Sequence, residues 1–345
     1  MPPEPGKNLP RSVEEWKAAA QPNGTIIVDI GASIHEQFRL NSGSEMDEED
    51  FLHLKTVWPN ADFDLIDKHH AHTQLRLGTW FAKAHRDLDN SPDFDRYLSA
   101  VERRDAPSPD IGMFWAAYEQ QYQVVQLLHH ESTTKRAYKM NEEHVNMSLV
   151  SFLQAVCACH PGLDISCNPA RVHLTFDFRQ VKEQKAANEI NSSVLSLSCR
   201  TDGLIESSTT GRMQAILEAK ARARAIHEPK VSWQETAEMV TAALSDRESL
   251  KHTRPGRVIL FSQDGDEFYV SEATIKVGYV KHMKDERKAP IRESEFVKIH
   301  QCGPYWVQSR QDVQYFAKLV LAIALRESQE ETASVSTHCL RSHDT

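Results

Sequence analysis

Two short apolar segments joined by a polar turn place the strongest constraint on how this chain folds. The first is residues 202–205, Asp-Gly-Leu-Ile, and the second is residues 216–220, Ile-Leu-Glu-Ala-Lys. Between them, residues 207–211 read Ser-Ser-Thr-Thr-Gly, a composition typical of a hairpin turn. The sequence therefore predicts two antiparallel strands with a turn centred on Thr210.

The predicted hairpin brings chemically active side chains together. A turn centred on Thr210 pairs Asp202 with Glu218, because each lies eight residues from that centre. Side chains alternate along a strand, so Glu218 and Lys220 share one face. Opposed strand residues have Cβ atoms roughly 4.5–5.5 Å apart, close enough for two carboxylates to share one divalent cation. Two acids and a lysine in this arrangement indicate a metal-dependent centre for phosphodiester hydrolysis.

A helix expected over residues 141–156 offers a third acid. Asn141 can serve as its N-cap. Its apolar stripe consists of Val145, Leu149, Phe152, Leu153 and Val156. At ~100° per residue, Glu142 lies about 40° from the centre of this stripe and Glu143 about 140° away. We therefore expect Glu142 to be the third metal ligand. The open alternative is a first-turn acid that only complements the helix dipole.

A second helix is expected to begin at residues 232–235, where Ser-x-x-Glu is typical of a capping box, so we assign Glu235 to capping. Its buried face is expected to comprise Trp233, Ala237, Val240 and Leu244. Gln234 and Glu238 lie one helical turn apart on a different face and can reach toward the Glu-x-Lys strand. For Gln234, a supporting role and a plain surface position remain equal alternatives.

The order of elements indicates an α/β (α+β) fold with a mixed sheet. After the helix at 141–156 we expect strands over 172–178, 194–205 and 213–221, the helix ending near 246, strands over 257–261 and 267–275, and a final helix after Ser309. Upstream, a short strand at 26–28 precedes a mainly helical region with segments at 74–85 and 111–128. We expect disorder in residues 1–24, apart from a possible helix at 13–20, and in residues 329–345.

Composition limits the class of protein. The 345 residues can bury a substantial core, and no apolar stretch is long enough to span a membrane or to act as a signal segment. We therefore expect an intracellular protein, in the nucleus or cytoplasm, without a membrane partner. The net charge of −9 argues against coating nucleic acid through bulk electrostatics, so any such contact must be local.

Three other patterns are weaker. Cys157, Cys159 and Cys167 are among six scattered cysteines that favour a reducing compartment, and zinc binding by them together with His160 is a minor alternative. An acid and imidazole cluster over residues 62–72 fits a solvated surface better than a metal site. It comprises Asp62, Asp64, Asp67, His69, His70 and His72. Residues 28–33, Val-Asp-Ile-Gly-Ala-Ser, faintly resemble the phosphate loop of actin-like ATPases, but a structural strand end is favoured.

The motifs as a set resemble the fungal branch of the PD-(D/E)XK nuclease-like family. The resemblance runs through residues 201–205, 216–220 and 234–239, then through 260–264 and 302–305, with an upstream acid motif at 142–146. It implies a restriction-endonuclease-like mixed central sheet flanked by helices over residues 136–328. It also implies metal ligation by Asp202 and Glu218, a catalytic lysine at Lys220, an accessory acid at Glu142 and a supporting Gln234.

Two functional hypotheses follow. The first is an Mg²⁺- or Mn²⁺-dependent nuclease acting on DNA or RNA, with Asp202, Glu218 and Glu142 around the metal and Lys220 at the phosphate. The second is a catalytically inactive nuclease-like interaction module, suggested by the acidic net charge and by residues 25–135, which offer a possible surface for a protein partner.

Overall fold

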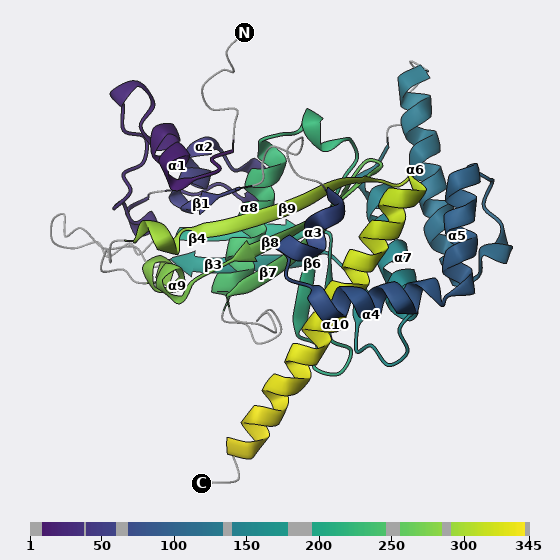
Figure 1. Ribbon diagram of the computed structural model, residues 1–345. Coiled ribbons are helices and arrows are strands. Elements are labelled where there is room, and N and C mark those ends of the chain that lie inside the picture. The colour runs from purple at the N-terminus through teal and green to yellow at the C-terminus, as the bar shows by residue number, and fades with distance from the viewer. Residues whose placement is uncertain are drawn as a thin grey trace.

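A seven-stranded mixed sheet forms the centre of the computed structural model (Figure 1). The structure describes residues 9–37, 39–59, 68–133, 140–178, 195–245, 256–284 and 291–341. The strand order is β1-β9-β8-β7-β6-β5-β2, and β3 and β4 form a separate two-stranded ribbon. The strands are β1 (Thr56–Val57), β2 (Ser166–Asn168), β3 (Val172–Phe178), β4 (Leu195–Thr201), β5 (Gly203–Glu206), β6 (Met213–Lys220), β7 (Arg257–Asp264), β8 (Glu267–Thr274) and β9 (Val297–Trp306).

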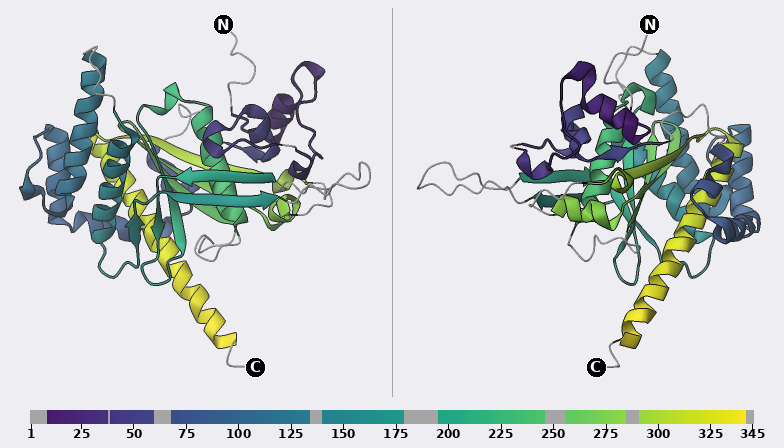
Figure 2. Two further views of the ribbon diagram at one scale, coloured as in Figure 1. Left: turned by 180° about the vertical axis from the view of Figure 1, so that it is seen from behind. Right: turned by 60° about the vertical axis from the view of Figure 1, so that its left-hand side comes forward.

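Helices cover both faces of the sheet (Figures 1 and 2). One face carries α4 (Gly78–Asp89), α5 (Pro92–Arg103), α6 (Trp115–Thr133), α7 (Glu142–Ala158) and α10 (Arg310–Arg341). The other carries α1 (Val13–Ala20), α2 (Glu48–His53), α8 (Lys230–Leu244) and α9 (Val277–Lys284). The short α3 (Ala71–Gln74) precedes α4. The molecule is therefore a three-layer mixed α/β structure, in agreement with the expected fold class.

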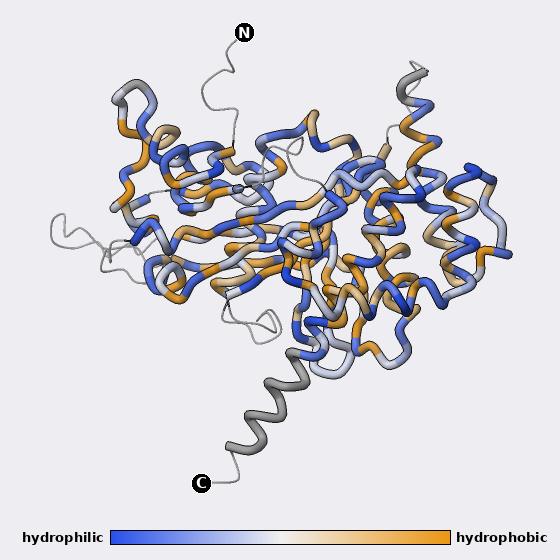
Figure 3. Tube along the Cα trace, in the orientation of Figure 1, coloured by the Kyte–Doolittle hydropathy of each residue, from blue (hydrophilic) through white to orange (hydrophobic). Residues whose placement is uncertain are grey.

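Alternation along the central strands separates two apolar cores. On β6, Leu217 packs into the α7 and α10 core, whereas Ile216 packs into the α8 core. Phe261 and Leu260 divide in the same way on the neighbouring β7. The strands are buried on both faces, as expected where β6 and β7 run parallel and are connected by α8. Apolar residues recur along these strands and the helices packed on them (Figure 3).

A stack of aromatic rings ties the helices to the sheet on the α10 side. Phe268 on β8 stacks on Phe316 of α10 with ring centroids 4.7 Å apart, and on Phe152 of α7 at 5.0 Å. All three rings are buried. This contact fixes α7, which carries Glu142, against the sheet.

Several expected elements are confirmed. The strand at 172–178 and the helix at 13–20 are present as β3 and α1, and Asn141 caps α7 by accepting a hydrogen bond from the Glu143 N–H. The helical segment at 74–85 is divided instead, because Arg76 adopts φ 52° between α3 and α4. The strand predicted at 194–205 is also divided, since it bends at Asp202 between β4 and β5.

Two predictions about helix and strand positions are wrong. α8 begins at Lys230, with Pro229 as N-cap, so Ser232 is inside the helix and its hydroxyl donates to Glu228 instead of capping. Residues 26–28 form no strand, and Ile26 is 60% exposed. The segment is a loop in which Val28 is buried in the α8-side core, whereas Ile26 and Ile27 are exposed.

The N-terminal region is divided between the two faces of the sheet. Residues 9–59 pack on the α8 side and include β1, an edge strand of the sheet, whereas residues 68–133 join the α10 side. Within residues 9–24, where disorder was expected, Trp16 of α1 is fully buried and packs edge-to-face on Phe296 at 5.2 Å. At the other end, α10 continues to Arg341, past the expected start of a tail at residue 329.

No helix in the described part of the chain has both the length and the apolar composition needed to cross a membrane.

Replacing Trp16 with alanine tests whether the N-terminal segment is part of one cooperative unit. We expect Trp16→Ala to lower the free energy of unfolding by about 3–5 kcal/mol, because it empties a fully buried indole site. Urea denaturation followed by circular dichroism measures this change. The control Trp306→Ala, at a ring that is 41% exposed, should cost less than about 1 kcal/mol. Equal, small effects in both variants would show that residues 9–59 unfold independently of the sheet.

Candidate functional site

The predicted hairpin register is confirmed. In the β5–β6 pair Gly203 lies opposite Leu217 and Leu204 opposite Ile216. Continuing this register by one residue places Asp202 opposite Glu218. Asp202 occupies the bend where the chain leaves the β3–β4 ribbon and enters the main sheet. The bend directs one acid toward the end of the central strand β6.

Asp202 is held rigidly by its neighbours. Its Oδ2 accepts a hydrogen bond from the Ala219 N–H at 3.0 Å, and its Oδ1 lies 3.1 Å from Nε of Arg171. Asn146 of α7 donates to its backbone carbonyl at 2.8 Å. Only 6% of the residue is exposed. The carboxylate therefore has a fixed orientation and one arginine counter-charge.

Glu218 and Lys220 form a buried ion pair on the same face of β6, as the alternation predicted. Lys220 Nζ lies 2.6 Å from Glu218 Oε1, and Glu218 is only 2% exposed. The second oxygen, Oε2, is buried and has no hydrogen-bond partner among the residues that the structure describes. A buried carboxylate oxygen in this state requires a proton or a cation.

The buried environment shifts the pKa values of both Glu218 and Lys220. Burial raises the pKa of Glu218 to about 8, with the positive charge of Lys220 opposing the shift and the negative charge of Asp202 adding to it. Burial alone would lower the pKa of Lys220, but the charge of Glu218 outweighs it and raises that pKa above its ordinary value. Lys220 therefore stays charged while Glu218 is poised to gain or lose a proton.

Gln234 links β6 to α8. Its Nε2 donates to Glu218 Oε1 at 2.6 Å and to Glu238 Oε1 at 2.9 Å. Glu238 is fully buried, and burial together with the charge of Glu218 raises its pKa well above the usual range. Gln234 therefore contacts the acid cluster, as its supporting role requires, and does not occupy a plain surface position.

Glu142 lies on the site side of α7 but does not join the two acids. Its Oε1 is 4.0 Å from Lys220 Nζ, and its side chain is 46% exposed. Glu143 faces solvent next to the N-cap. Helical phase thus selected Glu142, the acid that approaches the site. The expected convergence of three carboxylates is not observed, because Glu142 contacts Lys220 instead of joining the other two acids.

The carboxylates of Asp202 and Glu218 can serve as ligands for a divalent cation. Among the described residues no group of three or more His, Cys, Asp or Glu side chains lies close enough to hold a metal. Mg²⁺ often binds through one or two carboxylates and keeps several waters or substrate phosphate oxygens. Two neighbouring carboxylates with an orphaned buried oxygen on Glu218 fit that pattern, whereas a closed three-acid site does not.

Sequence reasoning missed a buried charge cluster that holds the end of β6. Arg224 is 1% exposed, and its guanidinium contacts Asp264 of β7 at 2.7 Å and pairs with Glu235 of α8. It also lies over the Tyr269 ring at 4.3 Å. The assignment of Glu235 to helix capping is therefore wrong. The only signal for this cluster in the sequence was that the strand and helix patterns place several charged residues at buried positions.

The structure adds no support for a functional site at the acid and imidazole cluster, at the three cysteines or in the loop at 28–33. Asp62, Asp64 and Asp67 lie outside the described residues, whereas His69 contacts Asp312 at 3.4 Å and the His72 ring contacts the Tyr315 hydroxyl at 2.8 Å. Cys157, Cys159 and Cys167 are free thiols. In the loop at 28–33, the Asp29 side chain accepts from the Gly31 N–H and so closes a local turn.

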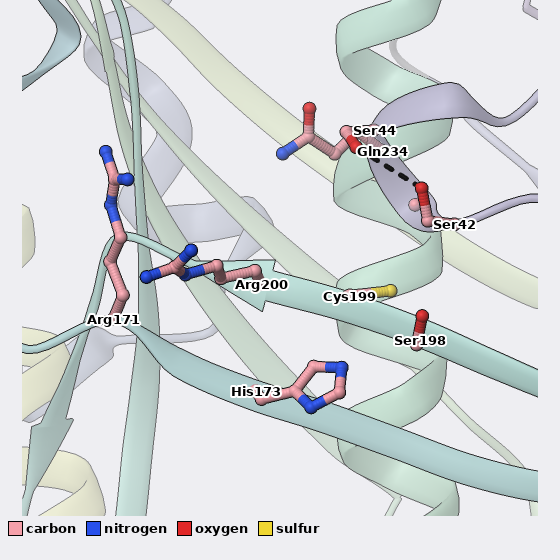
Figure 4. Close-up of a pocket in the computed structure, with 9 residues that line it drawn as sticks. Ser42, Ser44, Arg171, His173, Ser198, Cys199, Arg200 and Gln234 are labelled. Atoms are coloured by element: carbon pink, nitrogen blue, oxygen red, sulfur yellow. Dashed lines mark hydrogen bonds between the residues drawn. The ribbon is translucent and has the colours of Figure 1, made fainter.

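A pocket of about 510 Å³ adjoins the acid pair (Figure 4). It lies between the β3–β4 ribbon, the loop at 42–44 and α8. Its lining residues are Ser42, Gly43, Ser44, Arg171, His173, Ser198, Cys199, Arg200 and Gln234. Two of them, Arg171 and Gln234, also contact Asp202 and Glu218 respectively, so the pocket and the acids form one continuous site.

Comparison with known proteins yields neither a matching family model nor a matching curated protein.

The raised pKa of Glu218 predicts a pH-dependent stability in metal-free buffer. Between its ordinary value of 4.5 and the folded value of about 8 the folded protein holds the extra proton. The free energy of unfolding should therefore fall as the pH rises through this window. Glu218→Gln should flatten that fall, because the amide does not ionise. Urea denaturation from pH 5 to pH 9 with a chelator measures both slopes, and identical slopes would contradict the assignment.

Proposed function

We propose that this chain is an Mg²⁺- or Mn²⁺-dependent phosphodiester hydrolase acting on DNA or RNA, of the PD-(D/E)XK type and with a restriction-endonuclease-like fold. The observation that supports it most is the buried Glu218–Lys220 pair opposite Asp202 on one hairpin face. The order α7, β5, β6, α8, β7 around this hairpin agrees with the fold that the sequence motifs imply.

Each residue has a role that follows from its contacts. Asp202 and Glu218 would hold the cation, which neutralises charge on the phosphate when bound. Lys220, whose pKa is raised in this site, donates to a phosphate oxygen and stabilises the charge that develops there. Gln234 orients Glu218 through its amide, and Glu142 is an accessory acid that positions the lysine.

A second candidate is a nuclease-derived interaction module without catalysis. One observation favours it, since the Arg171 guanidinium already neutralises Asp202 and the Ala219 N–H occupies the other oxygen. In such a module Arg171 would replace the cation instead of yielding to it. The two candidates therefore differ in whether a metal binds at all.

Activity measurements test the first candidate. Purified protein with Mg²⁺ or Mn²⁺ should cleave DNA or RNA, and Lys220→Ala should lower the rate about 10²–10³-fold, as removal of a transition-state charge donor does elsewhere. The matched control is Lys298→Ala, an exposed lysine on β9, which should cleave at the wild-type rate. Equal cleavage by Lys220→Ala and wild type would refute the assigned mechanism.

Thermal melts separate the two candidates. Mn²⁺ at about 100 times its Kd should stabilise the native state by ~2.7 kcal/mol, because the cation binds the folded chain alone. Asp202→Asn should abolish the rise in Tm, whereas Asp177→Asn, an exposed acid on β3, should retain it. A wild-type Tm that Mn²⁺ leaves unchanged would favour the interaction module.

A further inference from the structure

We propose that the pocket beside Asp202 binds the backbone phosphate of an unpaired nucleotide, so that the substrates are single strands or single-stranded ends. This inference rests on the proposed function and extends it by naming the substrate class. Its main elements are Arg171, His173 and Arg200 on the β3–β4 ribbon.

Both faces of the ribbon line the pocket, with Cys199 on the α8 side and His173 and Arg200 on the outward side. His173 of β3 lies opposite Arg200 of β4, and Arg171 precedes the pair formed by Val172 and Thr201. Alternation sends Leu174 and its apolar neighbours into the α8 core and leaves the basic residues outward. Figure 4 shows the guanidinium groups of Arg171 and Arg200 at the same end of the pocket. Two guanidinium groups placed together form a site for a phosphate.

The side chains of Arg200 and His173 are open to a ligand. Within the part of the chain that the structure describes, the Arg200 and His173 side chains enter no ion pair or hydrogen bond, and both residues are exposed. Arg171 is 38% exposed and contacts Asp202 through Nε. A phosphate bound by Arg171 therefore lies next to Asp202, the proposed cation ligand.

The size and lining of the pocket favour an unpaired nucleotide. A volume of about 510 Å³ falls in the range of pockets for small ligands, about 300–1,000 Å³, and a double helix cannot enter it. The hydroxyls of Ser42, Ser44 and Ser198 can donate to phosphate or sugar oxygens. Such contacts fix the backbone without reading base edges, so binding should not depend on sequence.

Binding titrations test the inference separately from catalysis. Fluorescence anisotropy with a labelled oligothymidylate, in a chelator so that no cleavage occurs, gives the affinity at several salt concentrations. Arg200→Gln should weaken binding and reduce the slope of log K against log[salt] by about 0.7, the amount expected for one lost phosphate contact on a single strand. Arg86→Gln, an exposed arginine on α4 across the sheet, is the control with the same charge change.

The outcomes distinguish this inference from the proposed function. Weaker binding by Arg200→Gln than by Arg86→Gln, with a preference for the single strand over a blunt duplex of the same length, supports the pocket. Equal binding by both variants, or equal binding of strand and duplex, overturns it. Loss of metal-dependent cleavage in Lys220→Ala stands as evidence for the hydrolase in either case.

Discussion

Burial of the Glu218–Lys220 pair at the end of a central strand is the constraint on which the rest of the site depends. The middle of β6 is apolar on both faces, so two packed cores fix its position. The strand then places an acid and an amine where little solvent reaches them. A buried ion pair is stable only when hydrogen bonds satisfy its remaining atoms. Gln234 satisfies part of Glu218, and Oε2 is left for a proton or a cation.

A second buried charge cluster, shared with β7 and α8, also supports this strand end. Arg224 lies four residues beyond the end of β6 and connects this part of the chain to β7 through Asp264 and to α8 through Glu235. The Gly265 N–H also donates to the carbonyl of Lys220. Removing one member of such a cluster leaves an uncompensated buried charge, which is strongly destabilising. The lysine is thus held by backbone as well as by side-chain contacts, as a pre-organised charge donor must be.

Local patterns predicted the parts of the site that local geometry determines. The position of Thr210 between the two segments determined the pairing of Asp202 with Glu218, and helical phase selected Glu142 over Glu143. What failed depends on contacts between distant residues. The Ser-x-x-Glu pattern suggested a cap at Glu235, but an arginine eleven residues earlier in the chain binds that carboxylate in the folded state.

The bend at Asp202 shows a further limit of the sequence. Residues 194–205 alternate as one strand would, yet the chain changes sheets in the middle, and the ribbon it leaves supplies Arg171 and Arg200 to the site. Strand alternation does not report which neighbour a strand pairs with, because pairing is decided by tertiary packing. The sequence therefore did not predict the basic pocket, because its formation depends on the ribbon lying beside the two acids in the folded structure.

The most direct test of the central claim is a crystal soaked in Mn²⁺ and analysed by anomalous diffraction. The proposed hydrolase predicts an anomalous peak within about 2.2 Å of carboxylate oxygens of both Asp202 and Glu218, close to the ligand distance of small divalent cations. It also predicts that the peak disappears in Asp202→Asn crystals soaked in the same way. A map without a peak at these two acids, with Arg171 still bound to Asp202, would contradict the account.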